Sequence, residues 1–290
     1  MNKKVIKIKN SKLEVFTTGS GRPRILIISG IHGDETVGPL FIKKLLKEVE
    51  KQKIPGTLTI IPEANREALK KNMRFLPGSI DLNRSFSLPA SPTNRIRGLA
   101  KTIIKLCSGM DLVIDIHTLV RQNAVILGVL FPNGSNSVQR ETQRLLRLSG
   151  PEAIWKVDRV KESWIKGSLT QACLERGVPA FGLELPDNRA VVNKLKNKLM
   201  RILSMRPKSL KNPGVYGRVQ ERAVGPGFFQ PKAKPGDLVQ KEQVLGIFNG
   251  SGQKRSIKAT CNGTLLIVRQ KCEVREKEPL FTIGVKVGAP

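Results

Sequence analysis

The chain has 290 residues, of which 39% are hydrophobic, enough for one large domain or for a large and a small one. Lys and Arg total 51 against 23 Asp and Glu, so the formal net charge is +28. No apolar run approaches the roughly 20 residues of a membrane span, so no membrane partner is expected. The charge favours anionic partners. Proteins that bind single-stranded nucleic acid stack its bases on aromatic side chains. Because only 4% of the residues here are aromatic, nucleic acid is an unlikely partner.

Up to about residue 205, apolar runs of strand length alternate with segments whose apolar residues recur at helical spacing. The first two runs alternate in polarity, which predicts an opening hairpin. The expected strands span 5–8, 13–17, 24–29, 57–61, 111–116, 124–130 and 179–183, and the expected helices span 40–46, 93–106, 135–148, 168–176 and 189–205. This alternation predicts an α/β fold with a mostly parallel (mixed) sheet covered by helices on both faces.

The pattern changes after Arg206 and Pro207. Helical spacing ends there, and short apolar runs separated by glycine and proline continue to the end of the chain. Such runs are typical of small all-β structures. We therefore expect a boundary near Lys208, with one domain over residues 1–207 and a β-rich domain over residues 208–290.

The two histidines of the chain both lie at the carboxyl ends of expected strands. His32 follows the strand 24–29, with Glu35 three residues further on, and His117 ends a second apolar run. Ligands of open α/β sheets bind at this edge. A lone histidine is more often a packed core or surface residue, but the neighbouring carboxylate favours a metal. His32, Glu35 and His117 thus predict a His₂Glu site, the ligand set of the catalytic zinc of carboxypeptidase A, with one Zn2+ per chain.

Four motifs, in this order, carry a family resemblance. They are His32-Gly33-Asp34-Glu35, Asp81-Leu82-Asn83-Arg84-Ser85-Phe86, Asp115-Ile116-His117-Thr118 and the strand-end Glu184. Over residues 24–190 the chain resembles the succinylglutamate desuccinylase/aspartoacylase family of the zinc-carboxypeptidase-like superfamily. The resemblance implies a zinc-carboxypeptidase-like catalytic domain. The segments 235–239 and 259–263 resemble the barrel-sandwich β-domain that partly covers the cleft in this family.

The resemblance also suggests roles for side chains outside the metal site. Glu184, at a strand end, is the expected general base that takes a proton from water and gives it to the leaving amine. Arg84 is expected to bind a substrate carboxylate through its guanidinium, with Asn83 as a neutral donor. Arg74 is expected to stabilise the oxyanion. In so basic a chain, each arginine could instead be a surface charge.

The roles of several other polar residues are less specific. Asp81 and Asp115 could orient metal-bound imidazoles, but the sequence does not tell which carboxylate serves which ring. Aspartoacylases proper tend to carry Asn where this chain has Asp34, so the resemblance points to the broader deacylase group rather than to N-acetylaspartate. Tyr216, the only tyrosine, is expected to pack or lie at the surface rather than join the site.

These observations predict a zinc-dependent amidohydrolase that removes a small acyl group from an N-acyl amino acid or related N-acyl amine. Its partner would be a small anionic substrate. A metallocarboxypeptidase remains an alternative, since both substrates present a carboxylate next to an amide, as does a basic nucleic-acid-binding protein with a vestigial site. Cysteines without CxxC spacing and the lack of a signal-peptide-like stretch predict a cytoplasmic protein. The resemblance leaves a homo-oligomer open.

Overall fold

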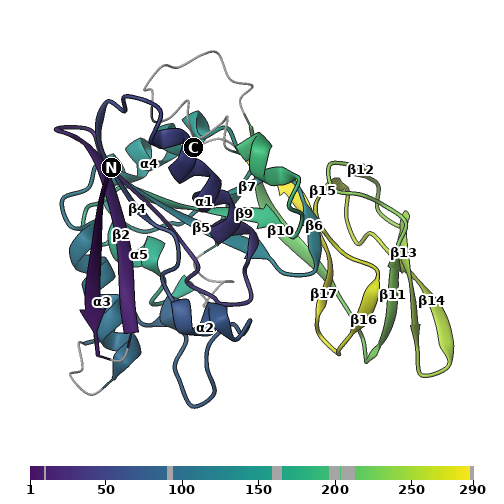
Figure 1. The fold of residues 1–290 in the computed structure, drawn as a ribbon. Helices are drawn as coiled ribbons and strands as arrows, with labels where there is room; N and C mark the ends of the chain where they lie inside the picture. Colours follow the sequence, from purple (N-terminus) through teal and green to yellow (C-terminus); the bar gives the residue numbers. More distant parts are fainter. Residues whose placement is uncertain (10, 90–93, 159–164, 196–202, 204–212, 288–290) are drawn as a thin grey trace.

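The computed structural model describes residues 1–9, 11–89, 94–158, 165–195, 203 and 213–287. Within these residues, thirteen strands form one large sheet and four form a second, smaller sheet. Figure 1 shows helices packed around the N-terminal part of the large sheet, with the strands of the C-terminal region extending to the other side. The fold is therefore a mixed α/β sheet joined to an antiparallel β region, as the sequence predicted.

The N-terminal half of the large sheet is built from an opening hairpin and a parallel centre. Its strands are β1 (Asn2–Ile8), β2 (Ser11–Ser20), β3 (Arg24–Ser29), β4 (Gly56–Ile61), β5 (Leu112–Leu119) and β9 (Ala180–Pro186). β1 and β2 pair antiparallel, whereas β3 runs parallel to β4 and β5, and β5 runs parallel to β9. The central strands are continuous apolar runs because helices cover both of their faces.

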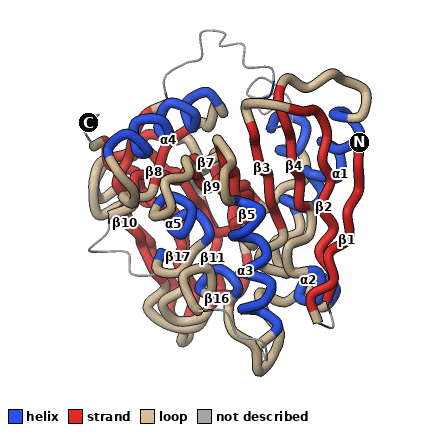
Figure 2. Tube along the Cα trace, turned by 90° about the vertical axis from the view of Figure 1, so that its left-hand side faces the viewer, coloured by secondary structure: helices blue, strands red, loops and turns tan. Residues whose placement is uncertain are grey.

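Helices cover both faces of this sheet. The helices are α1 (Val37–Val49), α2 (Arg66–Lys70), α3 (Arg95–Cys107), α4 (Asn136–Leu148) and α5 (Leu169–Leu174), and a 3₁₀ helix spans Leu82–Arg84. Apolar residues of α1 and α4 share one core, and those of α3 and α5 share the core of the opposite face. Figure 2 shows α3 and α5 lying over the strands. Of the helix expected over 189–205, residues 191–195 are helical and most of the rest lies outside the described residues.

The middle of the chain differs from the prediction. The single strand expected over 124–130 is two strands, β6 (Gln122–Ala124) and β7 (Leu127–Leu130), because β6 leaves its neighbours to pair with a C-terminal strand. The intervening Ile126 is buried, so the apolar run hides the break. A further strand, β8 (Ala153–Lys156), was not predicted; it is short and pairs in parallel with β7.

The C-terminal region continues the large sheet and adds the small one. Its strands are β10 (Gly214–Arg222), β11 (Gly227–Pro231), β12 (Leu238–Val239), β13 (Val244–Gly250), β14 (Gln253–Lys258), β15 (Gly263–Arg269), β16 (Cys272–Val274) and β17 (Pro279–Lys286). β10 pairs in parallel with β8 and antiparallel with β17. β14, β13, β11 and β16 form the small sheet. Phe229 and Phe281 meet edge to face in the core between the sheets.

The predicted domain boundary near Lys208 lies outside the described residues, so the division into residues 1–207 and 208–290 stays a proposal. What the structure describes is a sheet that runs without interruption from β8 into β10. Of the helices in the described ranges, none is long and apolar enough to cross a membrane. The functional consequence of the continuous sheet is that strands from both regions border the same cavity.

Candidate functional site

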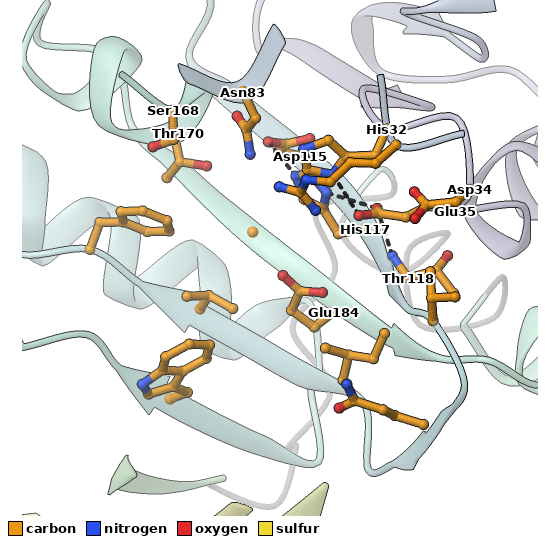
Figure 3. Close-up of a pocket in the computed structure, with 18 of the residues that line it drawn as sticks. His32, Asp34, Glu35, Asn83, Asp115, His117, Thr118, Ser168, Thr170 and Glu184 are labelled. Atoms are coloured by element: carbon orange, nitrogen blue, oxygen red, sulfur yellow. Dashed lines mark hydrogen bonds and ion pairs between the residues drawn. The ribbon is translucent and has the colours of Figure 1, made fainter. Parts of the chain in front are cut away.

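The three predicted metal ligands converge at the carboxyl edge of the parallel strands. His32 lies in the loop after β3, Glu35 shortly before α1, and His117 on β5. Nδ1 of His32 is 2.6 Å from one carboxylate oxygen of Glu35, and Nδ1 of His117 is 2.9 Å from the other. One ligand atom from each of the three side chains fits within 4.8 Å of the others. All three side chains are buried, so this is a compact, sheltered donor set (Figure 3).

A carboxylate lies behind each imidazole. Nε2 of His32 is 3.2 Å from Asp81, and Nε2 of His117 is 3.0 Å from Asp115. An imidazole that donates its Nε2–H to a carboxylate has its lone pair on Nδ1, and here both Nδ1 atoms face the carboxylate of Glu35. Two nitrogen lone pairs and a carboxylate that meet in this way are a donor set for a cation such as zinc. The residues present therefore fit a metal.

The charges of the site shift the pKa values of its members. Burial alone would lower the pKa of both imidazoles, but neighbouring carboxylates outweigh it: Glu35 and Asp81 raise the pKa of His32, and Asp115 and Glu35 raise that of His117. Burial alone would raise the pKa of Glu35, but the two imidazoles lower it overall. These shifts favour protons on the two imidazoles and negative charges on the carboxylates around them.

Glycine and backbone contacts give the loop after β3 its shape. A Cβ atom on Gly33 would lie 2.1 Å from the carbonyl carbon of Ala68 and 2.4 Å from the carbonyl oxygen of Met73, so no larger residue fits between His32 and Asp34. Glu35 also accepts a hydrogen bond of 2.9 Å from the backbone N–H of Thr118 on β5. These contacts fix the ligand loop against α2, against the segment that follows α2, and against the neighbouring strand β5.

Glu184 lies across the cavity from the three predicted metal ligands. It is in register with His117 on the adjacent strand, so the two side chains share a face of the sheet, and Figure 3 shows it pointing into the cavity. It accepts no hydrogen bond from the described residues. Burial, together with the charges of Glu35 and Asp115, raises the pKa of Glu184 to about 7, against the opposing effect of His117. A carboxyl group with such a pKa can both accept and return a proton near neutral pH.

Asn83 and Arg84 lie on the 3₁₀ helix beside the metal ligands. Asp81 caps this helix by accepting a hydrogen bond of 2.8 Å from the backbone N–H of Asn83. The Asn83 side-chain oxygen accepts from the backbone N–H of Leu169 at 3.0 Å, which leaves its amide nitrogen on the cavity side in Figure 3. Arg84 contacts the backbone oxygen of Asn83 at 2.6 Å, and no carboxylate of the described residues forms an ion pair with it. Both residues can therefore bind an anion.

Arg74 lies on the cavity wall, but its guanidinium is engaged. Its Nε and Nη2 atoms are 3.2 and 3.0 Å from the same oxygen of Asp81. Asp81 thus links Arg74 to His32, and the imidazole and the guanidinium lower the pKa of Asp81 although burial would raise it. Asp34, whose Oδ1 atom is buried without a hydrogen bond to the described residues, also borders the cavity.

The cavity that holds these groups has a volume of about 390 Å3. Sequence reasoning missed most of its walls. The residues not predicted are Thr118, Leu119, Val120, Gln122, Val129, Phe131, Trp155, Ser168, Thr170, Gly182, Arg218, Gln220 and Arg222. The last three come from β10, so the C-terminal region contributes to the cavity. Tyr216 is not among the cavity residues and packs beside Leu127 and Leu266. Thr118 lies within one of the family motifs, and Ser168 is the N-cap of α5; these two positions carried a sequence signal.

A model of the succinylglutamate desuccinylase/aspartoacylase catalytic domain matches residues 21–205, well over half of the chain. The chain belongs to this family. The resemblance seen in the sequence is thereby confirmed. A succinylglutamate desuccinylase from Ectopseudomonas mendocina is 30% identical over 181 residues, covering 57% of this chain and 51% of that protein. One from Pseudomonas putida KT2440 is 28% identical over 197 residues, covering 62% and 57%. The matches thus span little more than half the length of these relatives.

Solved structures extend the likeness to nearly the whole fold. An aspartoacylase family protein from Mesorhizobium loti superposes with a TM-score of 0.82 at 19% identity, covering 96% of this chain and 90% of that one. The product-bound ectoine utilization protein EutE from Ruegeria pomeroyi superposes with a TM-score of 0.80 at 20% identity, covering 98% and 93%. At these identities the likeness concerns the fold, and it includes the C-terminal β region.

Proposed function

We propose that this protein is a zinc-dependent amidohydrolase that removes a small acyl group from an N-acyl amino acid or a related N-acyl amine. The observation that carries the proposal is the meeting of His32, Glu35 and His117 at one side of a small cavity, with Glu184 facing that cavity from the adjacent strand. Membership of the succinylglutamate desuccinylase/aspartoacylase family supports a deacylase. Because the curated relatives are succinylglutamate desuccinylases, succinylglutamate is one candidate substrate among several.

Zinc is the proposed ion because a His₂Glu set suits a catalytic zinc. When bound, zinc supplies a Lewis acid that lowers the pKa of water and polarises a carbonyl. His32 and His117 would hold the ion through Nδ1, while Asp81 and Asp115 keep the rings oriented through Nε2. Glu35 adds a negative ligand, so one zinc per chain is expected.

The remaining side chains have proposed roles in binding and proton transfer. Glu184 accepts the proton of the attacking water and returns it to the amine nitrogen as the amide bond breaks, which its pKa of about 7 supports. Arg84 and Asn83 bind the carboxylate of the substrate. Arg74, whose guanidinium is paired with Asp81, is proposed to stabilise the oxyanion. Thiols free at all four cysteines support a cytoplasmic location.

The test is metal content measured together with hydrolysis of a substrate panel. The panel holds N-acetyl and N-succinyl amino acids and unmodified peptides, and the variants are His117→Ala and Glu184→Gln. We expect about one zinc per chain, cleavage of an N-acyl amino acid, and a fall in kcat of roughly 10²–10⁴-fold in Glu184→Gln with zinc retained. Glu242→Gln, an exposed residue of the C-terminal region, is the matched control and should keep full activity.

Two outcomes would contradict the proposal. Cleavage of peptides alone would identify a metallocarboxypeptidase. If the wild type bound no metal and His117→Ala changed neither metal content nor activity, the metal site would be refuted. The net charge of +28 would then make salt-dependent binding of nucleic acid the next property to measure.

A further inference from the structure

The carboxylate-binding residues lie between the metal ligands and the first turn of α5. The backbone N–H of Leu169 donates to Asn83, and the neighbouring Ser168 and Thr170 border the cavity. Figure 3 shows Ser168 and Thr170 on the side of Asn83 that faces away from His117 and the other ligands. A substrate whose amide lies at the metal and whose carboxylate lies at Asn83 therefore directs the side chain of its amino acid toward Thr170, away from the metal.

The floor below that position is a row of four residues across the sheet. Asp115 is in register with Gly182, Gly182 with Val129, and Val129 with Trp155. Residues in register share a face, and this face is the one that carries His117 and Glu184, each two residues further along its strand. All four residues of the row border the cavity. The floor thus leads from the metal ligands out to an indole ring.

Gly182 leaves a gap in this floor. A Cβ atom built on Gly182 would lie 3.5 Å from Cβ of Val129, 3.7 Å from its Cγ2 and 4.0 Å from the carbonyl oxygen of Asp115. These are ordinary contact distances, so the protein itself does not require glycine here. The missing side chain adds its space to the cavity, directly beside the apolar wall.

The wall around this gap is apolar. Val129, Phe131 and Trp155 are all buried and all border the cavity. The carboxylates nearest to Gly182 in the sheet are those of Asp115, on the adjacent strand, and Glu184, two residues along β9. An acidic side chain placed here would lose its hydration against apolar groups and would meet charges of its own sign. An apolar side chain would gain from burial.

One cation lies at the far side of this wall. The guanidinium carbon of Arg218, on β10, is 4.1 Å from the centre of the Trp155 ring, so the cation stacks on the indole face. A long acidic side chain that reached past Trp155 would find Arg218. This contact defines the competing possibility that the experiment has to separate.

We infer that the amine half of the substrate is an amino acid with an uncharged, apolar side chain, which lies over Gly182 against Val129, Phe131 and Trp155. The inference rests on the proposed function and specifies its substrate class.

The first measurement keeps the acyl group constant and varies the amino acid. Zinc-loaded enzyme is assayed with the N-acetyl derivatives of Ala, Leu, Phe, Asp and Glu. We expect kcat/KM for the Leu or Phe derivative to exceed that for Asp and Glu at least tenfold. Preference for the Asp or Glu derivative, abolished in Arg218→Met, would overturn the inference and leave the proposed function standing. If no N-acyl amino acid were cleaved, both this inference and the proposed function would be refuted.

Two variants change the size of the gap in opposite directions. Gly182→Ala fills it with one methyl group, so kcat/KM for Leu relative to Ala should fall about tenfold or more, the usual effect of one methylene in an apolar pocket. Val129→Ala enlarges it, so the ratio for Phe relative to Leu should rise. Gly225→Ala is the matched control, since nothing lies within 4 Å of its added Cβ and it is not a cavity residue. Unchanged ratios in both cavity variants, with zinc content and thermal unfolding intact, would refute the inference.

Discussion

Replacing Asp115 by asparagine should weaken zinc binding without disturbing the shape of the site. Asp115 is buried, and one of its oxygens lies 3.0 Å from Nε2 of His117. The side-chain oxygen of asparagine can accept the same hydrogen bond, so the ring keeps its orientation. What is lost is a negative charge, and among the neighbouring charges that raise the pKa of His117, that of Asp115 has the largest effect. Loss of such partners typically lowers metal affinity 10–100-fold, about 1.4–2.8 kcal/mol.

The structure also predicts a rank order. Asp81 serves His32 as Asp115 serves His117, but at the longer distance of 3.2 Å, and it is already ion-paired with Arg74 at 3.0 Å. Its charge is therefore partly neutralised by the guanidinium. Asp81→Asn should consequently reduce zinc affinity less than Asp115→Asn does.

The assay is competition for zinc against a chromophoric chelator at fixed pH and ionic strength. Asp237→Asn, in a turn of the C-terminal region far along the chain from the ligands, serves as the control. Among the described residues, its carboxylate accepts a single hydrogen bond, from the backbone N–H of Lys234. Thermal unfolding of each metal-free variant verifies that the fold is intact. An affinity of Asp115→Asn within twofold of the wild type, or a larger loss in Asp81→Asn, would refute this account of the two carboxylates.

Three further predictions concern charge and stability. In the metal-free protein the pKa values of His32 and His117 are raised, so the two protonated imidazoles contribute fully to stability below about pH 6.5. This contribution is lost as pH rises through the raised pKa values, which unfolding measured at several pH values will detect. Zinc affinity should rise over the same pH interval, because zinc displaces these protons. Zinc at ~100 times its Kd should raise the free energy of unfolding by about 2.7 kcal/mol, and His117→Ala should abolish this gain in chemical denaturation. Arg84→Met should lower kcat/KM roughly 10–100-fold for a carboxylate-bearing substrate and far less for its carboxamide, and equal losses would contradict a carboxylate-binding role.

The convergence of the three proposed metal ligands was predictable because each depends on a local pattern. His32 and His117 end apolar strands, Glu35 follows His32 at a fixed spacing, and a parallel sheet brings the carboxyl ends of its strands to one edge. No long-range information beyond this rule was needed. The position of Glu184 at a strand end follows the same rule, whereas its proposed role as general base comes from the resemblance.

The cavity walls were not predictable in this way. Val129 and Trp155 look like ordinary core residues, and only their register with Gly182 and Asp115 reveals that they border a cavity. β8 is four residues long, too short for periodicity to separate it from a loop. The contact between Arg74 and Asp81 depends on the path of an irregular loop, which no periodic pattern encodes.

The continuity of the large sheet bears on substrate size. β10 is hydrogen-bonded to β8 with Tyr216 in register with Trp155, so the position of Arg218 relative to the cavity floor is set by backbone pairing. The pairing of β6 with β15 joins the two regions a second time. A wall fixed at two places in the same sheet cannot swing aside without breaking strand pairs, unlike a lid on a flexible loop. A cavity of about 390 Å3 with a wall fixed in this manner lies at the small end of ligand pockets, a size that agrees with the proposed N-acyl amino acid substrate.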